Sequence, residues 1–200
     1  MITLALDTAT DRCTVAATDG TRVVERHLDG ARQHARSVLG LTDELLAELG
    51  ATPRDITRML TADGPGSFTG LRIGLSAARG LGLALGVPVI GVPSLLALSL
   101  PVSYNRAAVL LDARRDEAYF QAFSGPAIPA SEPQLLPMAE ARARIPPGAE
   151  VLTTPFVDIA ALARLAATLD PEAYPPEASY IRDADAKPQE KFRVARVTDA

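Results

Sequence analysis

The segment Asp63-Gly64-Pro65-Gly66-Ser67-Phe68-Thr69-Gly70 limits the possible folds of this chain most strongly. It follows an apolar stretch, 56–62, that predicts a buried strand, and it precedes a helical pattern that runs to about residue 85. Its glycines can adopt a positive φ, and Ser67 is a good N-cap residue. A strand, a glycine loop and a helix in this order can bind an anion or a phosphate. The backbone N–H groups of the loop lie free beside the positive N-terminus of the helix and can donate to it. A tight turn required by close packing explains the same residues equally well.

The remaining elements predict a mixed α/β fold, with sheets flanked by helices. Asp19-Gly20 lies between two alternating stretches and predicts a hairpin, so the chain begins with an antiparallel meander. A change in composition near residue 124 predicts a boundary between two subdomains. We expect strands over 2–6, 13–18, 21–27, 87–92, 107–111 and 117–123, and helices over 32–49, 69–85 and 156–169.

The composition excludes several classes of protein. The net charge of −4 gives no strong general field for nucleic acid. The two lysines, Lys187 and Lys191, leave no lysine for a phosphate loop of the Gly-Lys-Ser/Thr type. Two histidines without metal-ligand spacing and a lone Cys13 in an apolar stretch predict no metal site and no disulfide. No apolar run reaches the length of a membrane span, and no secretory signal is recognisable. We therefore expect a cytoplasmic protein with no membrane partner.

Carboxylates follow two of the predicted strands. Asp7 ends the first strand beside Thr8, and Asp112 ends a later one. A carboxylate at a strand end can be a metal–phosphate ligand or a general base, although it more often forms a turn. Together with Gly64, Gly66 and Ser67 of the glycine loop, these residues are the candidate nucleotide site.

The helix after the glycine loop carries a stripe of small residues. The stripe consists of Gly70, Gly74, Ala77 and Ala78, at helical spacing, and it lets another element approach closely. On the residues alone, tight internal packing is favoured over a subunit interface.

Several motifs together resemble one protein family, the TsaB (YeaZ) family of bacterial tRNA threonylcarbamoyladenosine biosynthesis. The glycine segment continues to Gly74 in the manner of that family. Other matching stretches are Leu4 to Thr10, Gln33 to Arg36, Gly91 to Leu95, Leu111 to Arg114 and Tyr180 to Asp183. The resemblance implies an actin-like ASKHA (ribonuclease H-like) fold with two subdomains. We expect an N-terminal subdomain over 1–105, a shortened second subdomain over 106–180, and a docking segment or tail over 181–200.

The resemblance also implies a role. Such a protein is not an enzyme by itself but a scaffold that pairs with the catalytic paralogue TsaD, or with itself as a homodimer. The pair then helps to recruit the ATPase TsaE and to form N6-threonylcarbamoyladenosine at position 37 of tRNAs that read ANN codons. The tRNA is reached through the complex. TsaD carries a metal-binding pair of histidines on the helix that here contains only His34.

The family pairs through its first two helices, and this implication reverses the preference for internal packing of the small-residue helix. The expected interface residues are Val38, Leu45, Leu49, Leu71, Arg72, Gly74, Leu75, Ala78 and Arg79. The set Asp7, Thr8, Gly64, Gly66, Ser67 and Asp112 then becomes a vestigial phosphate or nucleotide site. We expect no cofactor on this chain alone, and ATP or ADP only at the level of the complex.

Two other functions stay open as alternatives. The chain could be an autonomous phosphotransferase of the actin–sugar kinase type, with Asp7, Asp112 and the glycine loop as its ATP site. A peptidase is the weakest of the three, because the sequence offers no credible pairing of a nucleophile with a base.

Overall fold

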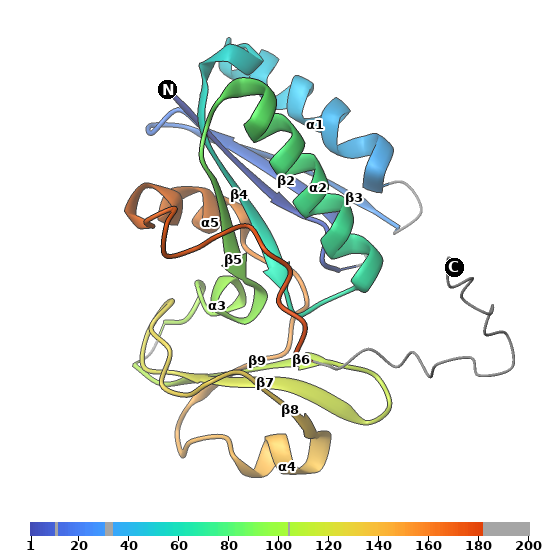
Figure 1. Ribbon diagram of the computed structural model, residues 1–200. Helices are drawn as coiled ribbons and strands as arrows, with labels where there is room; N and C mark the ends of the chain where they lie inside the picture. The colour runs from blue at the N-terminus through green and yellow to red at the C-terminus, as the bar shows by residue number, and fades with distance from the viewer. Residues whose placement is uncertain (11, 31–33, 104, 182–200) are drawn as a thin grey trace, which may run out of the picture.

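Five strands form the first of two sheets in the computed structural model, which describes residues 1–10, 12–30, 34–103 and 105–181. The strand order is β3-β2-β1-β4-β5, with β1 antiparallel to β2 and parallel to β4 (Figure 1). The hairpin between β2 and β3 turns at Gly20, whose φ is +94°, as the sequence predicts. The strands are β1 (Ile2–Asp7), β2 (Arg12–Thr18), β3 (Val23–Asp29), β4 (Ile56–Gly64) and β5 (Val89–Pro93).

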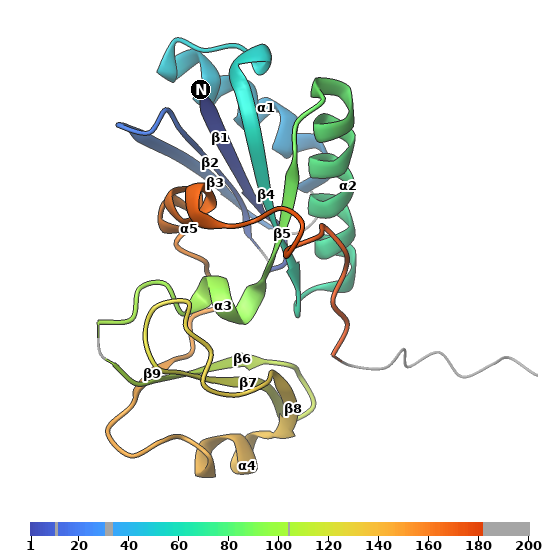
Figure 2. The same ribbon diagram turned by 60° about the vertical axis from the view of Figure 1, so that its left-hand side comes forward.

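Helices cover both faces of this sheet, as Figure 2 shows. One face carries α1 (His34–Leu49) and α2 (Phe68–Leu85), and the opposite face carries α5 (Ile159–Leu165). Strand side chains alternate between the faces, so Leu4 packs in the cluster beneath α1 while Ala5 belongs to the cluster with α5. The predicted helix over 156–169 is confirmed as α5. It begins three residues later than predicted, and its last part, η3 (Ala166–Thr168), is a 3₁₀ turn.

The second sheet has the order β8-β7-β6-β9. The predicted strands β6 (Ala107–Asp112) and β7 (Glu117–Phe123) form its centre. The proline-rich stretch after residue 124 gave no clear periodicity, and it contains elements that the sequence did not predict. These are β8 (Gln134–Pro137), α4 (Met138–Ala143) and β9 (Glu150–Leu152).

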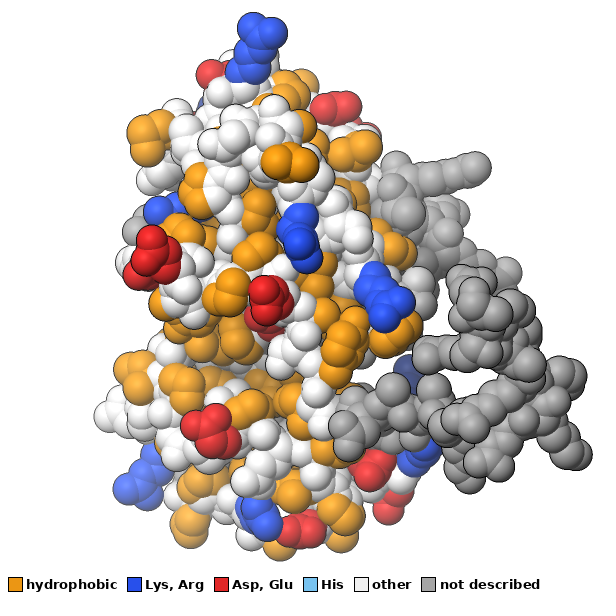
Figure 3. Space-filling view, viewed as in Figure 1, with side chains coloured by type: hydrophobic (Ala, Val, Ile, Leu, Met, Phe, Trp, Pro, Cys, Tyr) orange, Lys and Arg blue, Asp and Glu red, His pale blue; other side chains and the backbone are white. Residues whose placement is uncertain are grey.

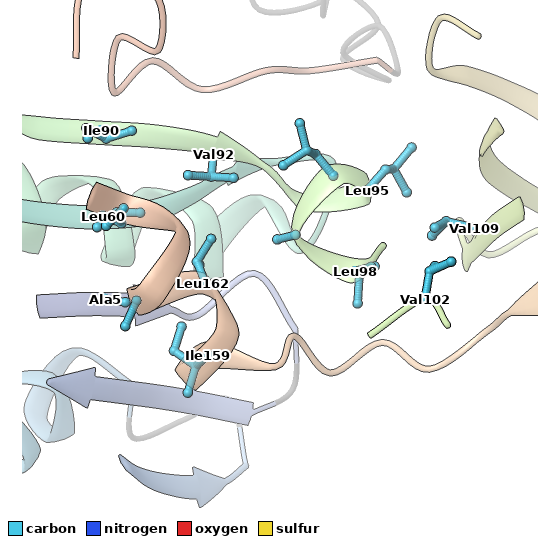
Figure 4. Packing of buried hydrophobic residues seen from close by; sticks show 14 of the residues in the cluster. Ala5, Leu60, Ile90, Val92, Leu95, Leu98, Val102, Val109, Ile159 and Leu162 are labelled. Atoms are coloured by element: carbon cyan, nitrogen blue, oxygen red, sulfur yellow. The ribbon is translucent and has the colours of Figure 1, made fainter. Parts of the chain in front are cut away.

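One hydrophobic core joins the two sheets. The short helix α3 (Ser94–Leu98), buried at every residue, lies between them. Figure 4 shows Leu162 of α5 near Ala5 and Leu60 of the first sheet, and Leu98 of α3 toward Val109 of the second. These packed layers form the predicted α/β fold, in which two sheets are flanked by helices.

The subdomain boundaries differ from the predicted ones in one respect. The second sheet does begin just after residue 105, but it ends with β9. The chain then returns to the first subdomain, where α5 packs on β1 and β2. The predicted unit 106–180 is thus divided, because residues 153–180 complete the first subdomain. Of the predicted segment 181–200, residues 182–200 lie outside the described residues.

Candidate functional site

The carboxyl end of β1 is buried. Asp7 is only 2% exposed, and burial raises the pKa of its carboxyl group to about 6. Its Oδ1 accepts a hydrogen bond from the Ala9 N–H at 2.8 Å. Thr8, also 2% exposed, donates from its hydroxyl to the Gly70 carbonyl oxygen at 2.7 Å. Both side chains therefore hold the loop after β1 in place, and neither faces an open site.

The glycine loop packs directly against the loop after β1. The Ser67 N–H donates to the Ala9 carbonyl oxygen at 2.7 Å, and a Cβ on Gly66 would stand 2.6 Å from the same oxygen. Ser67 is the N-cap of α2, as predicted, because its hydroxyl accepts from the Gly70 N–H. The two loops that would hold phosphates in the predicted nucleotide site thus occupy each other's space. This contact between the two loops supports the interpretation that the glycines are required for close packing.

A cleft of about 500 Å³ opens between the two subdomains beside these loops. Gly66, Ser67 and Asp112 line it, whereas Asp7, Thr8 and Gly64 do not. The structure thus brings together three of the six residues predicted for a nucleotide site. The Asp112 carboxylate already accepts from the Arg114 N–H at 2.8 Å.

Sequence reasoning missed several residues of the cleft wall. Arg114, Tyr119 and Phe156 line it from the second subdomain and from the segment that leads back to the first. Arg12 stacks over the Phe156 ring at 4.1 Å. No local pattern marks Phe156 as a cleft residue, because the sequence predicts it only as the start of a helix and it reaches the cleft through the tertiary fold.

Metal and thiol chemistry find little support in the described part of the chain. No group of three or more His, Cys, Asp or Glu side chains gathers there in a way that could hold a metal ion. Cys13 is fully buried, as predicted, and burial raises the pKa of its thiol to about 11. His34 begins α1, and Gln33 of the predicted motif lies outside the described residues.

The small-residue stripe of α2 faces the sheet of its own chain. A Cβ on Gly74 would stand 2.6 Å from Thr8 Oγ1 and 3.1 Å from Thr61 Oγ1. A Cβ on Gly70 would overlap the Thr8 carbonyl oxygen. The first interpretation of the stripe, tight internal packing, is therefore right, and its reassignment to a subunit interface is wrong.

The same burial corrects most of the predicted interface. Six of its nine residues are buried within the chain, because they are the side of α1 and α2 that packs on the sheet or the adjoining loops. These six are Val38, Leu45, Leu71, Gly74, Leu75 and Ala78. The other three, Leu49, Arg72 and Arg79, are partly or fully exposed.

The outer surface of α1 and α2, which we call the helical face, has a different composition. It exposes two leucines, Leu39 on α1 at 52% and Leu83 on α2 at 87%. Figure 3 shows the side of the molecule that carries α2, where hydrophobic side chains are interspersed with scattered charges. Among the side chains that the structure describes, the exposed charges on α1 are acidic, and those on α2 are basic: Asp43, Glu44 and Glu48 on α1, and Arg72 and Arg79 on α2.

A groove of about 570 Å³ adjoins this face at the carboxyl-terminal half of α2. Arg79 and Leu83 line it together with Pro176, which comes from the last described segment of the chain. Three glycines of the same region, Gly80, Gly82 and Gly86, keep the groove open.

Arg72 has a partner inside the chain. Its guanidinium lies 3.8 Å from the centre of the Phe68 ring, and its Nε donates to the Tyr180 hydroxyl at 3.3 Å. The Phe68 and Tyr180 rings are 5.6 Å apart. The predicted C-terminal element, beginning at Tyr180, therefore docks on the start of α2, while its residues Arg182 and Asp183 lie outside the described residues.

Comparison with known proteins finds similar sequences and structures. Residues 28–126 match the model of the TsaD family, tRNA N6-adenosine threonylcarbamoyltransferase. The TsaB protein of Escherichia coli K12 is 37% identical over 123 residues, which are 58% of this chain and 52% of that protein. The structure of YeaZ from Pseudomonas aeruginosa superimposes with a TM-score of 0.74 at 25% identity, over 90% of this chain and 99% of that one. The chain is similar to TsaB (YeaZ) proteins in sequence and in fold.

The match to the TsaB relatives covers only part of each chain. The TsaB protein of Bacillus subtilis is 29% identical over 122 residues, which are 60% of this chain and 53% of that protein. The chain thus spans about half the length of these TsaB relatives, although it covers almost all of the solved YeaZ structure. A second Pseudomonas aeruginosa structure, described as similar to the peptidase YeaZ, superimposes with a TM-score of 0.76 at 25% identity, over 90% of this chain and 99% of that one. Across the described residues, no helix combines the length and the apolar character needed to cross a membrane.

Proposed function

We propose that this chain is a non-catalytic subunit of the cytoplasmic bacterial machinery that forms N6-threonylcarbamoyladenosine at position 37 of tRNAs reading ANN codons. In this role it pairs with the catalytic subunit TsaD and helps to recruit the ATPase TsaE. The names of its relatives support a place in this biosynthesis.

The helical face is the observation that carries the proposal. Leu83 is 87% exposed on a regular helix, beside the groove that Arg79 and Pro176 also line. An exposed leucine next to an apolar groove and a charged rim is the composition of a docking surface. We propose that TsaD docks there, and that a second copy of this chain uses the same face when TsaD is absent.

The loops at the carboxyl end of β1 support a non-catalytic role. The Thr8 hydroxyl donates to the Gly70 carbonyl oxygen and the Ser67 N–H to the Ala9 carbonyl oxygen, so neither donor is free to bind a phosphate. We propose that this chain binds no nucleotide alone, and that ATP or ADP acts only in the complex. The acyl transfer to the adenine N6 amine then belongs to TsaD.

A reconstituted modification assay tests the proposal. TsaC, TsaD and TsaE are incubated with ATP, threonine, bicarbonate and tRNA, with and without this chain, and modified adenosine is measured. We expect modification to depend on the chain, and we expect the chain without TsaD to produce none. Equal modification with and without the chain would overturn the proposal.

The cleft keeps one alternative testable. Gly66, Ser67 and Asp112 line it, so an autonomous phosphotransferase retains part of a site. Titration of the isolated chain with ATP distinguishes the two functions. Saturable binding that is lost in Asp112→Asn would favour the phosphotransferase, and absence of binding at millimolar ATP would favour the accessory subunit.

A further inference from the structure

The Asp63 carboxyl group is buried, and one of its oxygens lacks a hydrogen-bond partner among the described residues. Asp63 lies at the end of β4 and is 7% exposed. Its Oδ1 has no hydrogen-bond partner among the described residues. Most buried polar atoms in proteins are paired, because an unpaired one loses its hydration without compensation. The arrangement around this carboxyl therefore needs a physical explanation.

Residues 174–181, which we call the strap, cover this end of β4. The Ser179 N–H donates to the Asp63 carbonyl oxygen at 2.8 Å, and the Gly91 N–H donates to the Tyr174 carbonyl oxygen at 3.0 Å. The strap thus crosses both β4 and β5 before it reaches α2, where Tyr180 contacts Arg72. It is a single layer of chain held at separate points.

Oxygens of the strap and of Asp63 converge beside Gly91. The position that a Cβ on Gly91 would occupy lies 3.1 Å from Asp63 Oδ2 and 2.6 Å from the Pro175 carbonyl oxygen. Two oxygens in one small space repel each other when the carboxyl is ionised. A neutral carboxyl removes this charge and supplies an O–H donor.

In the described part of the chain, no ion pair joins the Asp63 carboxyl. β5 and α3 contain no ionisable residue. The ionisable groups on the elements around it are Asp7 on β1, Arg58 on β4, Arg72 and Arg79 on α2, and Tyr174, Glu177 and Tyr180 on the strap. No hydrogen bond or ion pair joins any of these side chains, among the described residues, to the Asp63 carboxyl.

We propose that the strap is a proton-dependent clasp, held shut over the neutral Asp63 carboxyl and loosened when that carboxyl ionises. Lifting the strap lets water reach the charged group, and it breaks the backbone hydrogen bonds of Ser179 and Tyr174 and the contact between Tyr180 and Arg72. Its hydrogen bonds to β4 and β5 are to backbone atoms, so they re-form when the strap closes.

The sign of the pH dependence follows from the burial. Burial raises the pKa of Asp63 to about 7, whereas an open strap would return it toward the ordinary value of 3.8. The closed strap therefore holds the proton more tightly. The equilibrium constant for opening of the strap rises by up to about tenfold per pH unit between about pH 4 and about pH 7. Above about pH 7 it is constant.

The clasp would also act on the helical face. Pro176 of the strap forms one wall of the groove that Arg79 and Leu83 line. An open strap removes that wall, so docking and strap closure would be linked. This consequence rests on the proposed function, but the clasp itself is a property of the isolated chain.

Amide hydrogen exchange of the isolated full chain tests the clasp. Protection factors for residues 174–181 are measured at pH 5, 6, 7 and 8 and corrected for the intrinsic exchange rate. We expect protection to fall by up to about tenfold per unit between pH 5 and 7 and then to level off. In Asp63→Asn we expect protection that does not change with pH, and in the exposed control Asp112→Asn the wild-type profile.

Two results would overturn the proposal. One is a wild-type strap whose protection is the same from pH 5 to 8. This result needs no variant, so a misfolded Asp63→Asn protein cannot obscure it. The other is a folded Asp63→Asn protein whose strap keeps the wild-type pH dependence. Neither result bears on tRNA modification, because no partner is present.

Discussion

The two sides of α2 differ in what they contact. The inner side consists of residues such as Gly70 and Gly74, which touch the loop after β1 so closely that a methyl group would not fit. The outer side carries Gly80, which has no atom within 4 Å of its Cβ position, and the exposed Leu83. The comparison teaches that one side of a helix can pack on its own chain while the other side stays exposed and available to a partner protein. Small residues alone do not distinguish the two roles.

The largest expected effect separates glycines on the two sides. In Gly70→Ala, the new methyl group would overlap the Thr8 carbonyl oxygen, so we expect a loss of about 3 kcal/mol in the free energy of unfolding. In Gly80→Ala, we expect a gain of about 1 kcal/mol, because alanine is the better helix former and space is available. Urea denaturation measures both. Equal effects of the two variants would refute the distinction between the sides.

A second effect concerns the buried carboxyl at the end of β4. The folded chain binds the Asp63 proton more tightly than the unfolded chain, because the pKa is raised from 3.8 to about 7. The free energy of unfolding therefore falls as the pH rises through this range, because the folded chain must give up the Asp63 proton. We expect Asp63→Asn to raise the Tm at pH 8, with a smaller difference at pH 5. Asp112→Asn, at an exposed position, should show neither change.

The smallest effect is on the outer side at the start of α2. Arg72→Ala removes the contact with the Phe68 ring and the hydrogen bond to Tyr180, which together are expected to contribute about 0.5–1 kcal/mol. Arg79→Ala, two turns further along the helix, should leave the free energy of unfolding unchanged. Thermal unfolding of both variants decides the matter. If both lost the same stability, the Arg72 contacts would not anchor the strap.

The sequence predicted most of the fold, and physical reasons explain the exceptions. The alternating stretches before and after Gly20 and the N-cap of α2 are local signals, so their elements were found. The elements β8, α4 and β9 are short and partly exposed, and they depend on pairing with β7 and β6. The return of α5 to the first sheet is a tertiary event that no local pattern encodes.

The candidate site was harder to predict than the fold. Spacing placed Val38, Leu45 and Ala78 on one side of their helices, but it could not show whether a sheet or a partner covers that side. The residues that distinguish the two cases are Leu39 and Leu83, which interrupt the polar surface. Leu83 would have been visible in the sequence as a leucine outside the apolar stripe, whereas helical spacing places Leu39 on the apolar face, where it is nevertheless 52% exposed.

The most direct test of the account is a pairing and modification measurement on Leu83→Arg. Ile128→Arg serves as the matched control, because Ile128 is an exposed apolar residue of the second subdomain, at 57%. We expect Leu83→Arg to fold normally, to bind TsaD at least about tenfold more weakly, a change of about 1.4 kcal/mol, and to lose tRNA modification in proportion. Ile128→Arg should behave as the wild type. Wild-type binding and modification by a folded Leu83→Arg protein would contradict the account.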